Sequence, residues 1–200
     1  MSNNIKRWLL LTVGAGVLTL LLAVAFSFVF AYKAKATAAR YLLVVTRLDV
    51  GTTYGVAVEQ LRSEHIPLTL PSDCHHECTL LFKSDDKWLY MMHLAPPAEF
   101  VGRLDFRDEK LVYKKTAMGR EMCCFAVVIE SASTISRVVP GNLDSAGHPW
   151  KIDVELAASD VTQYRKKAYA FDVACIGSVR GCRTDEYLPT FNDLQQSASK

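Results

Sequence analysis

The sequence has almost no excess of charge of either sign and no internal repeat. Its 200 residues contain 23 lysines and arginines against 21 aspartates and glutamates, a formal net charge of +2 at pH 7. A protein that binds nucleic acid normally combines a basic stripe with a recognisable module. We therefore expect no nucleic-acid partner, and the absence of a repeated unit excludes a solenoid or propeller.

Common catalytic motifs are also missing. The histidines have no HExxH spacing, no serine lies in a GxSxG turn, and there is neither a P-loop nor a GxGxxG. The adjacent carboxylates Asp85-Asp86 and Asp108-Glu109 fall where hairpin turns are expected, and turn chemistry explains them. We therefore predict a protein that is not an enzyme, with no catalytic residue and no cofactor.

Residues 8–32 contain no side chain that is charged at neutral pH. At 1.5 Å per residue, a helix of this length crosses a hydrocarbon core of about 30 Å, and aromatic residues at its ends, Trp8 and Tyr32, suit the headgroup region. A cleaved signal peptide is the alternative, but its apolar region is normally only about 7–15 residues. We predict a short tail (1–7) and an uncleaved transmembrane helix (8–32) in the lipid bilayer. Basic residues flank this run: Lys6 and Arg7 before it, Lys33 and Lys35 after it.

Small residues recur at every fourth position along one stripe of this helix. Such a stripe lets two helix backbones approach closely, so it favours a homodimer or another membrane partner. The alternative is that the stripe merely reflects a composition rich in small residues. The candidate association residues are Ala15, Thr19, Ala23, Ser27 and Ala31.

The orientation of the helix rests on weaker signals. Basic residues are nearly balanced on its two sides, so the positive-inside rule decides little. All six cysteines follow the membrane segment, and an even number of cysteines suits an oxidising compartment. We expect a single-pass protein of the plasma (inner) membrane, with a cytoplasmic N-terminus and an extracytoplasmic C-terminal domain.

The cysteines permit more than one chemistry. Cys74 and Cys78 enclose two histidines, as in a metal cluster, but the other cysteines do not supply a matching second half. We predict no metal site and favour two local disulfides, Cys74 to Cys78 and Cys175 to Cys182, although six cysteines allow fifteen pairings. For Cys123, next to Cys124 in a strand-like segment, a buried structural thiol is the simplest role.

The residues after the membrane predict an α+β fold. We expect a juxtamembrane helix (33–50) and a second helix that ends before Pro67, together forming a helical hairpin. An antiparallel meander of about five to six strands should follow, then a C-terminal helix over 161–171. The soluble domain would cover 51–194 and a flexible tail 195–200. The expected strands are 80–83, 88–94, 102–107, 111–115, 122–130 and 150–156, with a loop at 140–149.

Residues 48–112 resemble the small envelope lipoproteins of the SmpA/OmlA type. The resemblance implies a helical hairpin packed on a short antiparallel sheet, in a protein that assists outer-membrane barrel assembly. The chain departs from that family because its first cysteine is Cys74, with no lipobox cysteine, and because His65-Ile66-Pro67 replaces a Gly-Pro. Overall, the chain also resembles membrane-anchored bacterial proteins without an assigned activity. The matching residues are Gly51-Thr52, Val58, Leu61, Trp88-Leu89-Tyr90, Leu104-Asp105-Phe106 and Leu111-Val112.

These observations favour a membrane-anchored, non-catalytic binding or assembly module of the cell envelope, whose protein partner the sequence does not identify. The alternative is a cysteine-based redox or metal sensor. The segment with Trp88, Tyr90, Met91 and Met92 either offers apolar surface to a partner or packs in the core.

Overall fold

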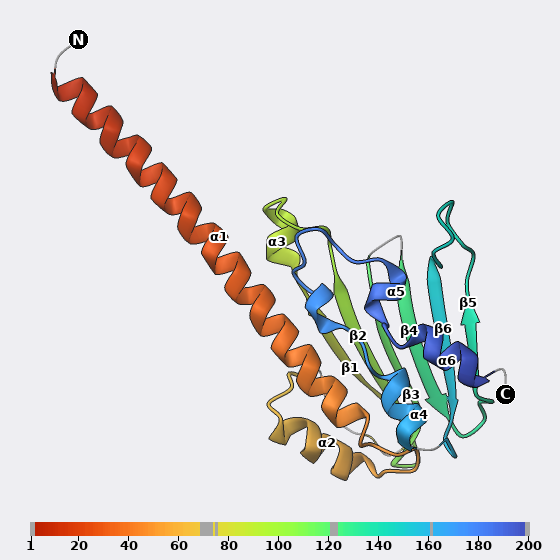
Figure 1. The fold of residues 1–200 in the computed structure, drawn as a ribbon. Helices are drawn as coiled ribbons and strands as arrows, with labels where there is room; N and C mark the ends of the chain where they lie inside the picture. The colour runs from red at the N-terminus through yellow and green to blue at the C-terminus, as the bar shows by residue number, and fades with distance from the viewer. Residues whose placement is uncertain (1–2, 69–73, 75, 121–123, 161, 199–200) are drawn as a thin grey trace.

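One helix, α1 (Asn3–Val45), carries the chain without a break from its apolar N-terminus into the soluble part (Figure 1). The computed structural model describes residues 3–68, 74, 76–120, 124–160 and 162–198. Within these ranges, one helix is long and apolar enough to span a membrane. The membrane segment and juxtamembrane helix expected from the sequence are therefore parts of a single rod.

The α+β class is confirmed, but the sheet is not a pure antiparallel meander. Its strand order is β1-β2-β3-β4-β6-β5. β6 lies between β4 and β5 in the sheet, although β5 precedes it in the chain. It pairs in parallel with β4 and antiparallel with β5. The strands are β1 (Glu77–Asp85), β2 (Glu99–Arg107), β3 (Lys110–Gly119), β4 (Phe125–Ser131), β5 (Arg137–Pro140) and β6 (Lys151–Ala157).

The hairpin of β2 and β3 follows its sequence pattern closely. Leu104 and Phe106 are buried while Arg103 and Arg107 are exposed, as the alternation predicts. The turn residues Asp108 and Glu109 both have positive φ, 48° and 60°, which is typical of the tight turns that match the twist of paired strands. The predicted role of these two carboxylates in a turn is confirmed.

The strand predicted at 88–94 is wrong, because this segment contains the short helix α3 (Lys87–Met91). β1 pairs instead with β2, along the full length of both strands. The run Trp88 to Leu94 has no alternating polar face, and only one side of it is needed for the core: Leu89 is fully buried while Trp88 is half-exposed. A single helical turn satisfies this one-sided pattern.

Short helices complete the fold. The expected second helix is present, and the predicted final helix ends at Ala168, before Phe171; its first expected residue, Val161, lies outside the described residues. The chain then adds three short helices, η1, α5 and α6, that the sequence analysis did not predict, and α6 enters the expected tail. The short helices that complete the fold are α2 (Tyr54–Ser63), α4 (Thr162–Ala168), the 3-10 helix η1 (Val173–Cys175), α5 (Thr184–Tyr187) and α6 (Phe191–Ala198).

The core lies between the sheet and the helices, which cover one of its faces (Figure 1). Tyr41 of α1 stacks on Phe82 of β1, with ring centroids 4.6 Å apart, and meets Phe100 of β2 edge-on at 5.8 Å. Gly102 lies directly beneath Tyr41, so that a Cβ there would overlap the tyrosine ring. The domain half of α1 is thus a core element of the sheet domain.

We predict that Gly102→Ala destabilises the domain by about 1–3 kcal/mol, because the added methyl group displaces the Tyr41 ring. Denaturant unfolding of the full chain in detergent micelles measures this. Gly55→Ala in α2 is the matched control: its Cβ meets open space, so stability should rise slightly. In a Tyr41→Ala background the cost of Gly102→Ala should vanish; an undiminished cost would contradict the packing.

Candidate functional site

Both cysteine pairs favoured by the sequence are at disulfide distance. The Cα atoms of Cys74 and Cys78 are 5.3 Å apart, and those of Cys175 and Cys182 are 5.7 Å apart. Cys74 and Cys175 are only 8% and 2% exposed. One sulfur of each pair is therefore shielded from solvent, which is typical of structural rather than exchanging disulfides.

The structure, over the residues that it describes, shows no metal centre at the histidines beside Cys74. His75 lies outside the described residues, and His76 is exposed, with its Nδ1 4.0 Å from Asp108. Across the described ranges, no three His, Cys, Asp or Glu side chains are grouped to hold a metal ion. Cys124 is disulfide-bonded and packs against the core, while Cys123 lies outside the described residues.

The small-residue stripe of α1 is divided between two environments. Ala15 and Thr19 are exposed, so they remain available to a neighbouring helix. Ser27 and Ala31, by contrast, are 2% and 5% exposed, and Ala31 packs with Leu89 of α3. The lower part of the stripe thus allows close approach of the chain's own domain.

Aromatic rings continue this contact between α1 and α3. The ring of Trp88 lies 6.2 Å from that of Phe26 and 6.0 Å from that of Phe30, centroid to centroid. Both phenylalanines belong to the apolar segment 8–32. The domain therefore touches the predicted membrane helix within that segment, before it ends.

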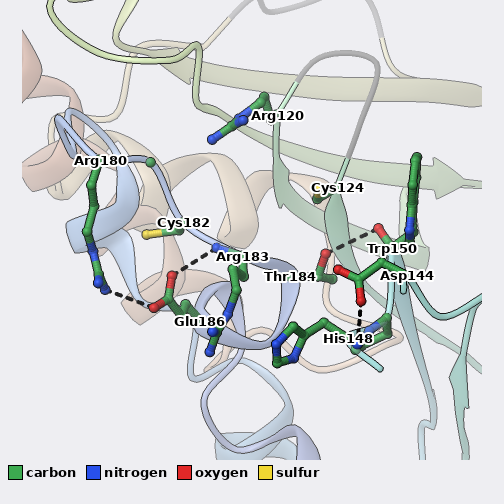
Figure 2. Close-up of a pocket in the computed structure, with 12 residues that line it drawn as sticks. Arg120, Cys124, Asp144, His148, Trp150, Arg180, Cys182, Arg183, Thr184 and Glu186 are labelled. Carbon is green, nitrogen blue, oxygen red and sulfur yellow. Dashed lines mark hydrogen bonds and ion pairs between the residues drawn. The ribbon is translucent and has the colours of Figure 1, made fainter. Parts of the chain in front are cut away.

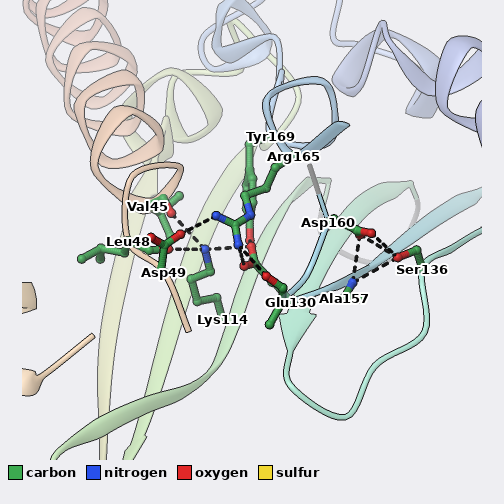
Figure 3. A network of polar contacts seen from close by, with 11 residues as sticks. Val45, Leu48, Asp49, Lys114, Glu130, Ser136, Ala157, Asp160, Arg165 and Tyr169 are labelled. Atoms are coloured by element: carbon green, nitrogen blue, oxygen red, sulfur yellow. Dashed lines mark hydrogen bonds and ion pairs between the residues drawn. The ribbon is translucent and has the colours of Figure 1, made fainter. Parts of the chain in front are cut away.

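A buried charged cluster holds the other end of α1 (Figure 3). Lys114 and Glu130, both fully buried, form an ion pair at 2.8 Å across β3 and β4. The Lys114 ammonium also donates to the carbonyls of Val45 and Leu48, at 3.2 and 2.6 Å. These carbonyls lie where α1 ends and lack helical partners. A cation there satisfies them and interacts favourably with the negative end of the helix dipole.

Arg165 of α4 joins this cluster from the other side. Its guanidinium contacts Glu130 at 2.7 Å and Asp49, just beyond α1, at 2.5 Å. The Tyr169 hydroxyl donates to Glu130 at 3.3 Å. Burial lowers the pKa of Lys114, against the opposing effect of Glu130, and burial raises the pKa of Tyr169 well above its usual range. The hydrogen bonds and ion pairs of this cluster join separate segments of the fold, so their role is structural.

A cavity of about 360 Å³ lies between the loop before β6 and the segment 180–186 (Figure 2). Three arginines line it, and two are paired: Arg180 with Glu186 at 2.8 Å, and Arg183 with Asp185 at 3.1 Å. The third, Arg120, hydrogen-bonds Tyr187, which opposes the rise in the pKa of Tyr187 caused by burial. All three arginines of this cavity are therefore held by partners within the fold.

The same cavity offers no arrangement for nucleophilic catalysis among its described residues. The Thr184 hydroxyl donates to the carbonyl of Trp150 at 3.2 Å, and Cys124 and Cys182 are disulfide-bonded. His148 is 3.9 Å from Asp185 and has no free hydroxyl or thiol beside it in the described lining. A nucleophile next to its base is the minimum for such chemistry.

The uncovered face of the sheet carries a second candidate binding surface. Ion pairs between neighbouring strands cover its edges, such as Lys83 with Glu99 at 2.9 Å and Arg137 with Glu155 at 2.7 Å. Between them lies an apolar depression of about 320 Å³. Its apolar lining includes Val101, Ala117, Phe125 and Val127.

The sequence analysis missed the charged cluster, the cavity and the uncovered-face depression as sites. Only the cluster had a local signal. Lys114 and Glu130 lie at buried positions of neighbouring strands, and two opposite charges at such positions indicate a buried pair. The residues of the cavity come from segments distant in the chain, so no spacing identified them.

We predict that Lys114→Met destabilises the full chain by about 3–5 kcal/mol, because it leaves the carbonyls at the end of α1 unpaired and removes a charge partner from Glu130. Lys115→Met is the matched control, since Lys115 points to the uncovered face and should change stability by less than about 0.5 kcal/mol. Denaturant midpoints in detergent micelles compare the two. Equal effects would contradict the structural role of the cluster.

Tyr169 should make the fold sensitive to alkali. Its pKa is raised in the folded state, so above about pH 10 the phenol ionises first in the unfolded chain. We expect the stability of the wild type relative to Tyr169→Phe to be constant below about pH 10 and to fall by up to about 1.4 kcal/mol per pH unit above it. Unfolding curves between pH 8 and 11 test this; a constant difference would contradict it.

Comparisons with known proteins found no relative of this chain. No family model, curated protein or solved structure matches this chain. The resemblance of residues 48–112 to SmpA/OmlA-type lipoproteins therefore stays a prediction, and function has to be argued from the residues themselves.

Proposed function

We propose that this protein is a single-pass, membrane-anchored, non-catalytic binding or assembly module of the cell envelope. The observation that carries the proposal is the continuity of α1, whose first half is apolar and exposed and whose second half is buried in the domain core. Such a rod fixes both the height and the orientation of the domain above the bilayer. A tethered enzyme that must reach distant substrates would gain nothing from this rigidity, whereas an assembly module would.

The side chains of the domain support a non-catalytic role. The buried ionisable residues Lys114, Glu130 and Arg165 are occupied in holding the end of α1 to the sheet. The cavity beside the Cys175 to Cys182 pair combines arginines with partnered hydroxyl and disulfide groups, which suits recognition of a polar group. The depression around Phe125 supplies a separate apolar surface for an envelope partner.

The proposed compartment follows from the cysteines. Two pairs at disulfide distance favour an oxidising environment, which supports a domain outside the cytoplasm and an N-terminus inside. In the membrane, a homodimer would use the exposed upper stripe, Ala15 and Thr19, because Ser27 and Ala31 face the chain's own domain.

We predict that a membrane-impermeant maleimide labels this protein in intact cells only after treatment with an impermeant reductant. The two disulfide pairs block their thiols before reduction, and an extracytoplasmic domain exposes them afterwards. The readout is the mass shift of the protein after blotting. A cytoplasmic protein with a known surface thiol is the control for cell integrity. Labelling that appears only on lysis would overturn the proposed orientation.

A further inference from the structure

We propose that α3 is a second membrane contact, in which Trp88, Tyr90 and Met91 enter the interfacial layer of the bilayer beside the anchor helix. This inference rests on the proposed anchoring by α1. It assigns a lipid-contacting surface to a segment of the folded domain that is distant from the anchor in sequence. The domain would then be fixed to the bilayer at two points.

The position of α3 along the anchor is the first argument. Trp88 packs against Phe26 and Phe30, whose midpoint lies about 20 residues after Trp8 in the same helix. At 1.5 Å per residue this is about 30 Å, the thickness of the hydrocarbon core. With Trp8 at one interface, Trp88 therefore lies at the level of the other. Figure 1 shows α3 beside the middle of α1, at the end of the domain nearest the anchor.

The composition of the exposed surface is the second argument. Trp88, Tyr90 and Met91 are 45%, 50% and 50% exposed, although each is large and apolar in most of its surface. Tryptophan and tyrosine concentrate at membrane interfaces because their apolar rings and polar groups match that layer. An apolar patch contiguous with a membrane helix meets lipid before it meets any soluble partner.

Charges around the patch favour the same occupant. Lys33 lies 5.8 Å from the centroid of the Phe30 ring, just beyond the patch on α1, and Lys87 is exposed at the start of α3. Both are placed to reach lipid phosphates. The acidic residues beside Tyr90 and Met91 are Asp85 and Glu99, 3.9 and 2.9 Å from Lys83, and Asp86, which is buried.

The patch is held in a fixed position by the domain. Leu89 is fully buried with Ala31 and Ala95 under α3. The Asp86 carboxylate, immediately before α3, accepts the amides of Ala98 at 2.9 Å and Gly177 at 3.0 Å. Because α3 is ordered by these contacts, its aromatic side chains reach the interface without an ordering cost on binding.

Tryptophan fluorescence of the full chain in phosphatidylcholine and phosphatidylglycerol vesicles tests the proposal. In Trp8→Phe/Trp150→Phe, only Trp88 remains. We expect lipids brominated near the headgroup end of their acyl chains to reduce its emission at least about twofold, and acrylamide in the water to quench it weakly. A chain with Trp8 alone reports on insertion of the anchor.

The matched control places a single tryptophan at the far end of the domain. The probe is Ile135→Trp in a chain without the three native tryptophans. Ile135 is 82% exposed and lies in the loop after β4, beyond Glu130 of the charged cluster at the end of α1. Acrylamide should quench it freely, and brominated lipid should not. This variant sets the value expected for a probe in water.

Three results would overturn the proposal, and they differ in what else they imply. If Trp8 is quenched by brominated lipid while Trp88 behaves like the probe at 135, α3 lies in water and the anchor stands. If Trp88 is shielded from both quenchers, a second copy of the chain covers the patch. If Trp8 is not quenched either, the proposed anchoring fails as well.

Discussion

The ion pair of Lys114 and Glu130 is the interaction on which the rest of the structure depends. It satisfies the carbonyls at the end of α1, and through Arg165 it joins that end to α4 and to Asp49. Two charges buried without such partners would destabilise the core. Because each partner comes from a different part of the chain, the cluster fixes where α1 ends on the sheet, and with it the angle between α1 and the sheet.

One helix therefore has two kinds of surface. Its first half has exposed apolar side chains and is long and apolar enough to span a membrane, and its second half packs on the sheet with Ala38, Tyr41 and Val45. Small residues allow the close contacts of this helix: Ala31 lets α3 approach α1, and Gly102 of the sheet makes room for the Tyr41 ring. The arginine-lined cavity and the depression around Phe125 consequently keep a constant orientation relative to α1.

The sequence predicted those features that local patterns encode. The apolar run predicted the long apolar helix at the N-terminus, and the alternation around Leu104 and Ile152 predicted β2 and β6. It failed where distant contacts decide. The parallel pairing of β4 with β6 has no local pattern, and the run from Trp88 to Leu94 contains the helix α3 while β1 pairs with the more distant β2. The burial of Lys114 depends on partners 66 and 69 residues earlier in the chain.

These long separations have a consequence for biosynthesis. The apolar domain half of α1 leaves the ribosome long before β1 to β4, which supply its packing partners, and Arg165 follows Asp49 by 116 residues. During that interval, if α1 anchors the chain as proposed, Tyr41 and its neighbours are exposed beside the bilayer. A domain built from such distant contacts folds slowly, so the nascent chain would depend on the bilayer itself, or on a chaperone at its surface, to shield the helix until the sheet arrives.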